Sequence, residues 1–211
     1  MHAVQAGDDR PVLDMGGWEM KAYYLDHGKE NAVVKKEEDG SLLKLKFLPF
    51  SWENYEGLSE EAEPIGETDV QRIIDTFETA EKAHAGQTDK AGKPYIHHPL
   101  RVSQLVKGGV DEILTALLHD VAEDTEMTLD DLRTLGYSDS VVNAVDCMSR
   151  RNGEARGDYL NRLKPNETAR RVKLADLAHN SDISRIKDPQ EKDFRRVENY
   201  KREMEFLSRE D

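Results

Sequence analysis

The hydrophobic pattern of this 211-residue chain changes once, near residue 66, and this change limits the folds that it can adopt. Before that point, short apolar runs alternate partly with polar residues, and the turn-forming segment 38–41 (EDGS) separates two of the runs. This pattern is typical of strands joined in an antiparallel sheet. After residue 66, apolar residues recur every three or four positions, as they do in amphipathic helices. The sequence therefore predicts a small β-rich segment followed by an all-α bundle.

The β-rich segment is expected to contain two or three strands, at 18–25, 32–36 and 42–48. Residues 60–66 (EEAEPIG) indicate a linker, so we divide the chain into an appendage, 1–65, and a helical domain, 66–211. We expect the appendage to form separately and to be dispensable for chemistry. Its acidic character suits a protein partner or a second subunit better than an anionic ligand. In the competing interpretation, its aromatic residues complete the core of the helical domain; these are Trp18, Tyr23, Tyr24 and Phe47.

Helix-start signals recur along residues 66–211. Thr128 followed by Asp131 is a capping pattern, and Gly136 is suited to end the helix that this pair begins. The helix before it should run through Val121 without a break, and a later one should reach Ile183. The expected helices start at Thr68, Pro99, Asp111, Thr128, Ser138, Glu167 and Pro189.

Charge and composition exclude several classes of protein. The chain has 30 basic and 43 acidic residues, a net charge of −13, which disfavours binding to duplex nucleic acid. No stretch approaches the roughly 18 apolar residues of a membrane span, and the first ten residues lack the features of a signal peptide. With a single cysteine, Cys147, these observations lead us to expect a cytoplasmic protein. Residues 145–187 carry a net charge of +4, which indicates either a small phosphorylated ligand or a salt-bridged helix surface.

The pair His119-Asp120 is the first candidate for chemistry, because it directly follows the apolar run 114–118 and should be buried. Neighbouring side chains on a helix diverge by about 100°, yet both can reach an ion that lies between their directions. A buried histidine and carboxylate without a partner are costly, which favours a cation as the third group. The alternative is a buried His–Asp hydrogen bond, and the pair alone does not decide between them.

Further residues extend this candidate site. Asp176 and Asn180 are four positions apart and share one face of a helix, while His98 lies where a loop meets a helix. Two imidazoles and two carboxylates suit Mn²⁺ or Fe²⁺ better than a thiophilic ion, and they leave coordination positions for water and substrate. Glu123 and Asp124, one turn beyond Asp120, could act as a general base or position water. Their alternative interpretation is a solvated helix end.

Four segments resemble the motifs of RelA/SpoT-type alarmone hydrolases. The first motif is similar to residues 83–87 (AHAGQ) and 92–99 (GKPYIHHP), and the central one to residues 117–125 (LLHDVAEDT). The third is similar to residues 173–180 (KLADLAHN), and residues 196–200 (RVENY) resemble a ligand-covering helix of the small members. The resemblance spans about residues 68–208, with its motifs in the family's order.

This resemblance implies an all-α HD-domain bundle with one Mn²⁺ ion per chain, Fe²⁺ being the second choice. The implied metal ligands are His98, His119, Asp120 and Asp176. Glu123 and Asp124 would activate the water that attacks the 3′-pyrophosphate of ppGpp, the alarmone of the stringent response. The implied products are pyrophosphate and a nucleoside di- or triphosphate.

The resemblance also implies residues that bind the nucleotide. Asn180 would face the ribose and its phosphate, and Lys90 the region near the base. The implied phosphate contacts are Arg151, Arg196 and Tyr200. Asp89 stands where larger members carry an arginine that stacks on guanine, so the choice between guanine and adenine stays open. The other interpretations are an HD phosphohydrolase for another nucleotide, such as ppApp or NADPH, and a non-catalytic module that binds a nucleotide or a partner.

Overall fold

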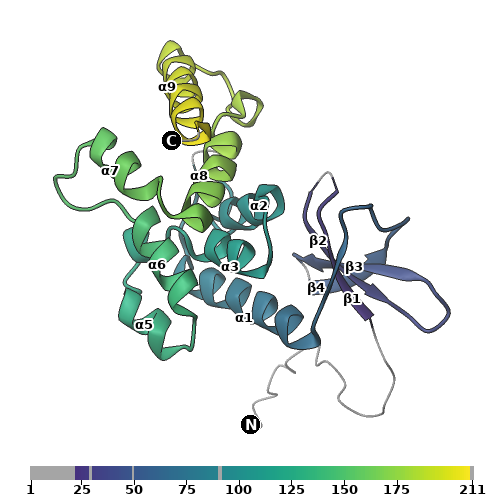
Figure 1. The fold of residues 1–211 in the computed structure, drawn as a ribbon. Coiled ribbons are helices and arrows are strands. Elements are labelled where there is room, and N and C mark those ends of the chain that lie inside the picture. Colours follow the sequence, from purple (N-terminus) through teal and green to yellow (C-terminus); the bar gives the residue numbers. More distant parts are fainter. Residues whose placement is uncertain (1–21, 29, 49, 90–91, 210–211) are drawn as a thin grey trace, which may run out of the picture.

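A computed structural model describes residues 22–28, 30–48, 50–89 and 92–209. An N-terminal antiparallel sheet lies beside a larger bundle of helices (Figure 1). This arrangement confirms the predicted fold class, an all-α bundle with a small β-sheet before it. In the described part of the chain, no helix is both long and apolar enough to cross a membrane.

The sheet has five strands in the order β4-β3-β2-β1-β5, rather than the two or three that were predicted. The strands are β1 Ala22–Asp26, β2 Ala32–Lys36, β3 Leu42–Phe47, β4 Phe50–Asn54 and β5 Glu63–Ile65. The prediction of a linker at 60–66 was wrong for its last part, because β5 pairs with β1 through Tyr23 and Ile65. A three-residue strand that contains Pro64 carries no periodic signal, and its pairing with a distant strand stabilises it. Residues 18–21 of the expected first strand lie outside the described residues.

Asp26 holds the loop that follows β4 against the sheet. Its side chain is fully buried and accepts hydrogen bonds from Ser59 N (2.9 Å), Ser59 Oγ (2.5 Å), Tyr55 Oη (3.1 Å) and Gly28 N (3.0 Å). Burial alone would raise the pKa of Asp26, but these hydrogen bonds outweigh burial and lower it. The carboxylate is thus stabilised in its ionised form, and the loop 55–59 is fixed to the end of β1.

The helices run from residue 67 to residue 208, and α3 lies at their centre. Its residues 113–118 are all buried, and it packs against α1, α2, α6 and α8. The bounds are α1 Glu67–Ala83, α2 His97–Leu105, α3 Val110–Leu118, α4 Val121–Asp124, α5 Leu129–Thr134, α6 Asp139–Met148, α7 Arg156–Leu163, α8 Glu167–Asn180, a 3₁₀ turn Ile183–Arg185 and α9 Glu191–Ser208. The caps predicted at Thr128 and Ser138 are confirmed, because each hydroxyl accepts a backbone N–H of its helix.

Several local predictions about the helices were wrong. Gly66, not Thr68, is the N-cap of α1, and α7 was missed because it is short and strongly polar. The helix expected to continue to Val121 breaks after Leu118, so that α4 starts a separate short turn. The helix expected to reach Ile183 ends at Asn180, and a 3₁₀ turn follows it. These boundaries depend on side-chain contacts made by distant segments.

The sheet and the helices share one hydrophobic cluster. Phe77 of α1 is fully buried and contacts Phe47 and Phe50, with ring centroids 4.9 and 5.5 Å apart. Asn31 donates from Nδ2 to the carbonyl oxygens of Ser103 (3.0 Å) and Val106 (2.5 Å) at the end of α2. The contact of Phe47 with α1 favours the interpretation in which the aromatic residues of the appendage complete the helical core.

Asp26→Asn is expected to lower the free energy of unfolding at pH 7 by about 1–3 kcal/mol, because it removes a charged acceptor from buried donors. Since the pKa of Asp26 is lower in the folded than in the unfolded protein, its stabilisation is complete above the unfolded pKa of about 3.9 and is lost as the pH falls through the folded value. Urea unfolding at pH 7 and pH 3 measures this, with Glu56→Gln, an exposed site in the same loop, as control. An equal loss at both pH values would contradict the assignment.

A fragment that begins at Gly66 tests the division at residue 65. We expect it to unfold at a lower temperature than the full chain, because the buried side chains of Ile73 and Phe77 lose their cover. The candidate site residues all lie after residue 66, so the folded fraction should still bind metal. Thermal unfolding and metal content measure both effects. A fragment as stable as the full chain would instead support a separately formed appendage.

Candidate active site

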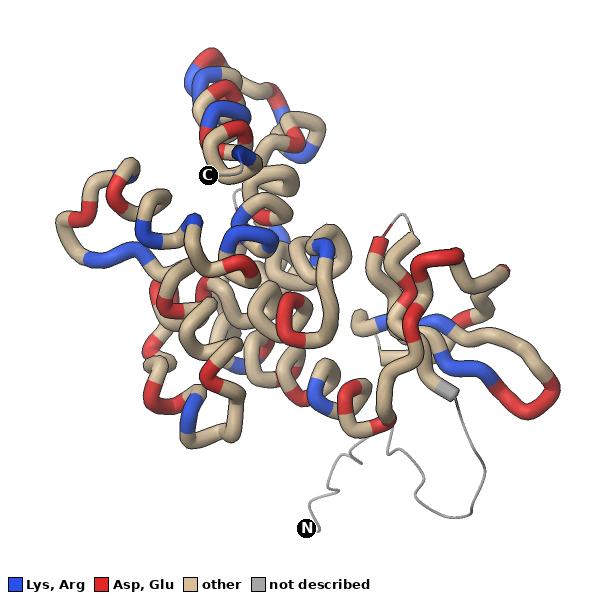
Figure 2. The backbone as a smooth tube through the Cα atoms, in the orientation of Figure 1, with Lys and Arg blue, Asp and Glu red and all other residues tan. Residues whose placement is uncertain are grey.

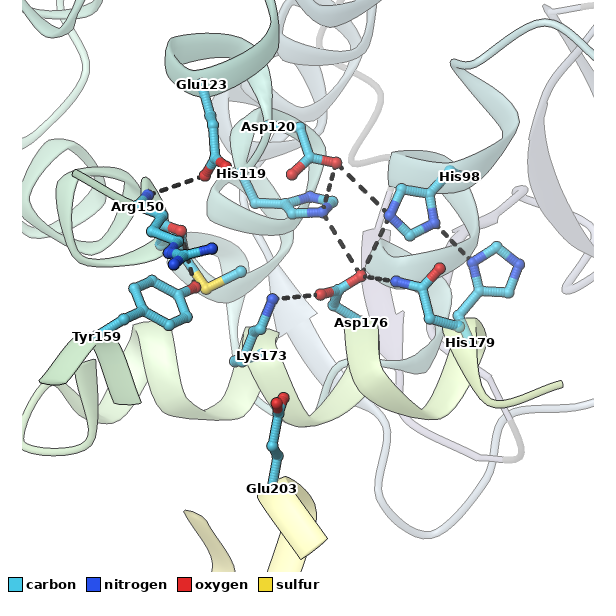
Figure 3. A network of polar contacts seen from close by, with 12 residues as sticks. His98, His119, Asp120, Glu123, Arg150, Tyr159, Lys173, Asp176, His179 and Glu203 are labelled. Carbon is cyan, nitrogen blue, oxygen red and sulfur yellow. Dashed lines mark hydrogen bonds and ion pairs between the residues drawn. The ribbon is translucent and has the colours of Figure 1, made fainter. Parts of the chain in front are cut away.

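Four side chains from three separate regions converge in the helical domain (Figure 3). His98 Nε2 lies 3.2 Å from Asp176 Oδ1 and 3.6 Å from Asp120 Oδ2. His119 Nε2 lies 2.9 Å from Asp120 Oδ2 and 3.9 Å from Asp176 Oδ1. The four residues that the sequence predicted as metal ligands are therefore brought together, and His98, His119 and Asp176 have the geometry of a metal-binding group.

The break between α3 and α4 places two of these side chains. His119 follows the last residue of α3 and Asp120 directly precedes α4, so the pair lies at a helix junction rather than inside one helix. His98 comes from the first turn of α2, and Asp176 from the third turn of α8. Because α2 and α3 both pack against α8, the three regions meet in the interior of the domain.

His119 shows why this cluster suits a cation. Its Nδ1 donates to the carbonyl oxygen of Ala116 (2.8 Å), so the buried Nε2 is the nitrogen that faces the carboxylates. That nitrogen has no hydrogen-bond partner within the described residues, although Asp120 Oδ2 lies close to it. Burial alone would lower the pKa of His119, but the carboxylates of Asp120 and Asp176 raise it to about 9. The site therefore attracts positive charge to Nε2, and its two imidazoles and two carboxylates fit a divalent ion.

Each proposed ligand is also held by a neighbouring group. Tyr95 Oη donates to Asp120 Oδ2 (2.5 Å), and Asn180 Nδ2 donates to Asp176 Oδ1 (2.5 Å). Lys173 Nζ donates to Asp176 Oδ2 (2.7 Å). Such contacts orient ligands and tune their basicity. Burial would raise the pKa of Asp176, but the charge of Lys173 holds it well below its usual range.

The contact between His98 and His179 links the two nitrogens Nδ1 across 2.8 Å. Burial and the neighbouring His98 lower the pKa of His179 to about 4, so its ring is neutral at pH 7 and its Nδ1 can accept a hydrogen bond from His98 Nδ1. In this arrangement His98 Nε2 faces the carboxylates of Asp120 and Asp176. The sequence analysis missed His179, Tyr95 and Lys173, although His179 and Lys173 each lie three positions from Asp176.

Glu123 and Asp124 do not occupy equivalent places. Glu123 lines the same cavity as the proposed metal ligands, and its Oε2 accepts a hydrogen bond from the backbone N–H of Arg150 (2.8 Å). Asp124 lines a separate shallow hollow, with Gln87 Nε2 bound to its carbonyl oxygen. Burial, and then the charges of Asp120 and Glu123, raise the pKa of Asp124. Of the two predicted catalytic groups, Glu123 is the better placed to contact a ligand in the cavity.

The cavity has a volume of about 430 Å³ and is rich in basic side chains. Asn180, Arg196 and Tyr200 line it, while Lys90 lies outside the described residues. Arg151, the phosphate contact predicted in the basic turn, is not part of the lining and pairs with Asp146 (3.4 Å). Its neighbour Arg150 lines the cavity instead. The basic residues of the lining are Arg150, Arg156, Lys173, Arg185 and Arg196.

Basic side chains occur both in the connection between α6 and α7 and along α9, whose surface carries both charges (Figure 2). Asp89 lines the cavity too, and its Oδ2 forms an ion pair with Arg185 (3.1 Å). The described lining carries five basic and five acidic side chains, so the excess of negative charge in the whole chain does not extend to the cavity walls. The acidic members are Asp89, Asp120, Glu123, Asp176 and Asp182.

A family model described as "HD domain" matches residues 76–202, more than half of the chain. The chain belongs to the HD-domain family. This HD domain includes all four proposed metal ligands, and the match confirms the family that the motifs predicted.

The relatives of this HD domain include much longer proteins. The chain is 35% identical over 152 residues to "GTP pyrophosphokinase" of Streptomyces coelicolor, covering 63% of this chain and 17% of the relative. It is 37% identical over 87 residues to "Bifunctional (p)ppGpp synthase/hydrolase SpoT" of Escherichia coli, covering 40% and 12%. These names support the predicted resemblance to RelA/SpoT-type proteins, of which this chain spans less than a fifth.

A solved structure shares the fold. It is described as "A metazoan ortholog of SpoT hydrolyzes ppGpp and plays a role in starvation responses" and matches with a TM-score of 0.53 and 20% identity. The match covers 65% of this chain and 85% of that one. The likeness supports the fold alone.

Asp120→Ala is expected to abolish metal binding, because it removes a charged oxygen that faces both imidazoles. Elemental analysis after incubation with Mn²⁺ and desalting measures the bound metal. Glu126→Ala, an exposed carboxylate outside the cluster, is the control and should keep the metal content of the parent protein. Full occupancy in Asp120→Ala would refute the proposed ligand set.

Proposed function

We propose that this HD domain is a metal-dependent phosphohydrolase that removes the 3′-pyrophosphate of a (p)ppGpp-like nucleotide. The observation that carries this proposal is the convergence of His98, His119, Asp120 and Asp176 beside a cavity that is rich in charged side chains and that Glu123 also lines. Relatives described as ppGpp 3′-pyrophosphohydrolases support the substrate class. Pyrophosphate and a nucleoside di- or triphosphate would be the products.

The proposed metal is Mn²⁺, held by the two imidazoles and two carboxylates. When bound, it would supply Lewis-acid polarisation of the phosphate and favour deprotonation of water. Glu123 would accept a proton from the attacking water, since its carboxylate lines the cavity and the N–H of Arg150 fixes its Oε2. Asp124, whose pKa is raised, would assist from beside the cavity.

The proposed substrate contacts follow the lining of the cavity. Asn180 would face the ribose and its phosphate, and Arg196 and Tyr200 of α9 would contact the phosphates. Lys90 stays a sequence-based proposal for the region near the base. A nucleotide substrate and a single cysteine are consistent with the cytoplasm as the proposed compartment. The N-terminal sheet is the proposed binding surface for a protein partner or a second copy of the chain.

A second candidate is an HD phosphohydrolase for another nucleotide, such as ppApp or NADPH. The ion pair between Asp89 and Arg185 supports this second candidate. Both side chains line the cavity, and neither is specific for guanine. A non-catalytic binding module explains the placement of Glu123 less well, since binding alone does not require a carboxylate next to the metal site.

Separate incubation of the Mn²⁺-loaded protein with ppGpp, ppApp and NADPH tests the proposal. Chromatography and phosphate analysis resolve the products, and protein treated with a chelator is the control for metal dependence. Release of pyrophosphate from ppGpp is the expected result. If only ppApp or NADPH is cleaved, the second candidate is correct, and if no nucleotide is cleaved, the catalytic proposal is wrong.

Glu123→Gln is expected to keep metal and nucleotide binding while turnover falls about 10²- to 10⁴-fold, the usual range for an acid–base group. The amide cannot accept the proton of the attacking water, but it can still accept the N–H of Arg150. Steady-state rates and elemental analysis measure the two properties, and Glu126→Gln is the control. Turnover at the parental rate would show that Glu123 is only a helix-end residue.

A further inference from the structure

Lys173 is a buried cation that pairs with the proposed metal ligand Asp176. It lies on α8, one turn before Asp176, and its side chain is only 12% exposed. Burying an ammonium group is costly unless it is paired, and the 2.7 Å contact with Asp176 Oδ2 provides that pairing. Its side chain also lines the cavity.

Asp176 divides its two carboxylate oxygens between Lys173 and the cluster. Its Oδ2 accepts from Lys173, and its Oδ1 faces the imidazoles of His98 and His119. An ammonium group carries three N–H donors, and Asp176 accepts one of them. Lys173 would then be a positive group with donors to spare beside the metal, where it suits an anion.

Arg156 supplies a second cation to the same part of the cavity. Its guanidinium carbon lies 5.0 Å from the ring centroid of Tyr159, and Lys173 Nζ lies 5.6 Å from the same centroid. Both side chains therefore surround one aromatic ring, which is fixed because Tyr159 Oη donates to the carbonyl oxygen of Met148 (2.8 Å). In Figure 3, Tyr159 and Lys173 lie on the side of Asp176 that faces away from His179.

Glu203 of α9 holds the Arg156 guanidinium in place. It accepts from Nε (2.9 Å) and Nη2 (2.7 Å), which is the bidentate geometry that fixes an arginine most firmly. Held in this way, Arg156 needs no rearrangement to meet a ligand, and pre-organised groups bind with less entropic cost. Arg185, in contrast, lines the cavity together with the carboxylates of Asp89 and Asp182, which repel an anion.

We infer that Lys173 and Arg156, arranged around Tyr159, form an anion subsite that receives the pyrophosphate group of the substrate and retains pyrophosphate after cleavage. The identity of this anion rests on the proposed function, whereas the existence of the subsite does not. Arg156 and Lys173 act here by direct contact with phosphate oxygens, and the contact of Lys173 with Asp176 links the subsite to the metal.

Binding of inorganic pyrophosphate to the full-length, Mn²⁺-loaded protein tests this inference. Titration calorimetry on protein desalted to remove free metal measures the dissociation constant, and elemental analysis confirms the metal content. We expect Lys173→Met and Arg156→Met each to weaken pyrophosphate binding about tenfold or more, since each removes a charged donor. Arg185→Met, on the other wall, should change the constant less than about threefold. Arg156→Met keeps the test valid if Lys173→Met loses its metal or fails to fold.

Glu203→Gln is the matched control for Arg156→Met, because both variants break the same ion pair between α7 and α9. If Arg156 only joins these helices, the two variants should weaken pyrophosphate binding equally, and the inference is overturned. If Arg156 binds the anion, Glu203→Gln should bind pyrophosphate at least as tightly as the parent protein. Unchanged binding in Arg156→Met and in metal-loaded Lys173→Met, or an equal loss in Arg185→Met, would also overturn it.

The same measurements separate this inference from the proposed function. If the variants follow the expected order but the parent protein releases no pyrophosphate from ppGpp, the subsite stands and the proposed hydrolysis is wrong. If the parent protein cleaves ppGpp but the variants bind pyrophosphate equally well, the subsite is wrong and the proposed hydrolysis stands.

Discussion

Two imidazoles and two carboxylates face one point in the interior of the helical domain. The fold around them depends on how the unshared electron pairs of these four groups are satisfied. His119 is the strictest case, because the carbonyl oxygen of Ala116 fixes a proton on Nδ1 and turns Nε2 toward Asp120. Such a contact is repulsive unless a positive charge lies nearby. The burial of α3 and the break after Leu118 bring about this arrangement.

Positively charged side chains lie around the cluster, some in contact with it and others farther away. Lys173 is paired with Asp176 at the cluster itself, and Arg156 and Arg196 stand farther out, each paired with an acidic residue of α9. Each of these three cations therefore has a carboxylate as its counter-charge within the described part of the chain. The cavity can still accept an anion, since these cations keep donors that their partners do not use.

The N-terminal sheet is connected to this centre through packing rather than through polar contacts with the cavity. Phe47 and Phe50 cover Phe77 of α1, and Asn31 satisfies two carbonyl oxygens at the end of α2, the helix that carries His98. The sheet thus steadies the outer side of two helices whose other side faces the core. This explains how a segment without site residues could still influence the position of a metal ligand.

The sequence by itself determined the fold class and the candidate ligands, because hydrophobic periodicity is local and the motifs around His98, His119 and Asp176 are distinctive. It could not determine β5, which depends on pairing with β1 across the chain, or the break at His119-Asp120, which lies inside a continuous apolar pattern. The choice of Arg150 over Arg151 likewise required tertiary structure. Adjacent residues point in different directions, and only the packing of distant segments decides which of them meets the cavity.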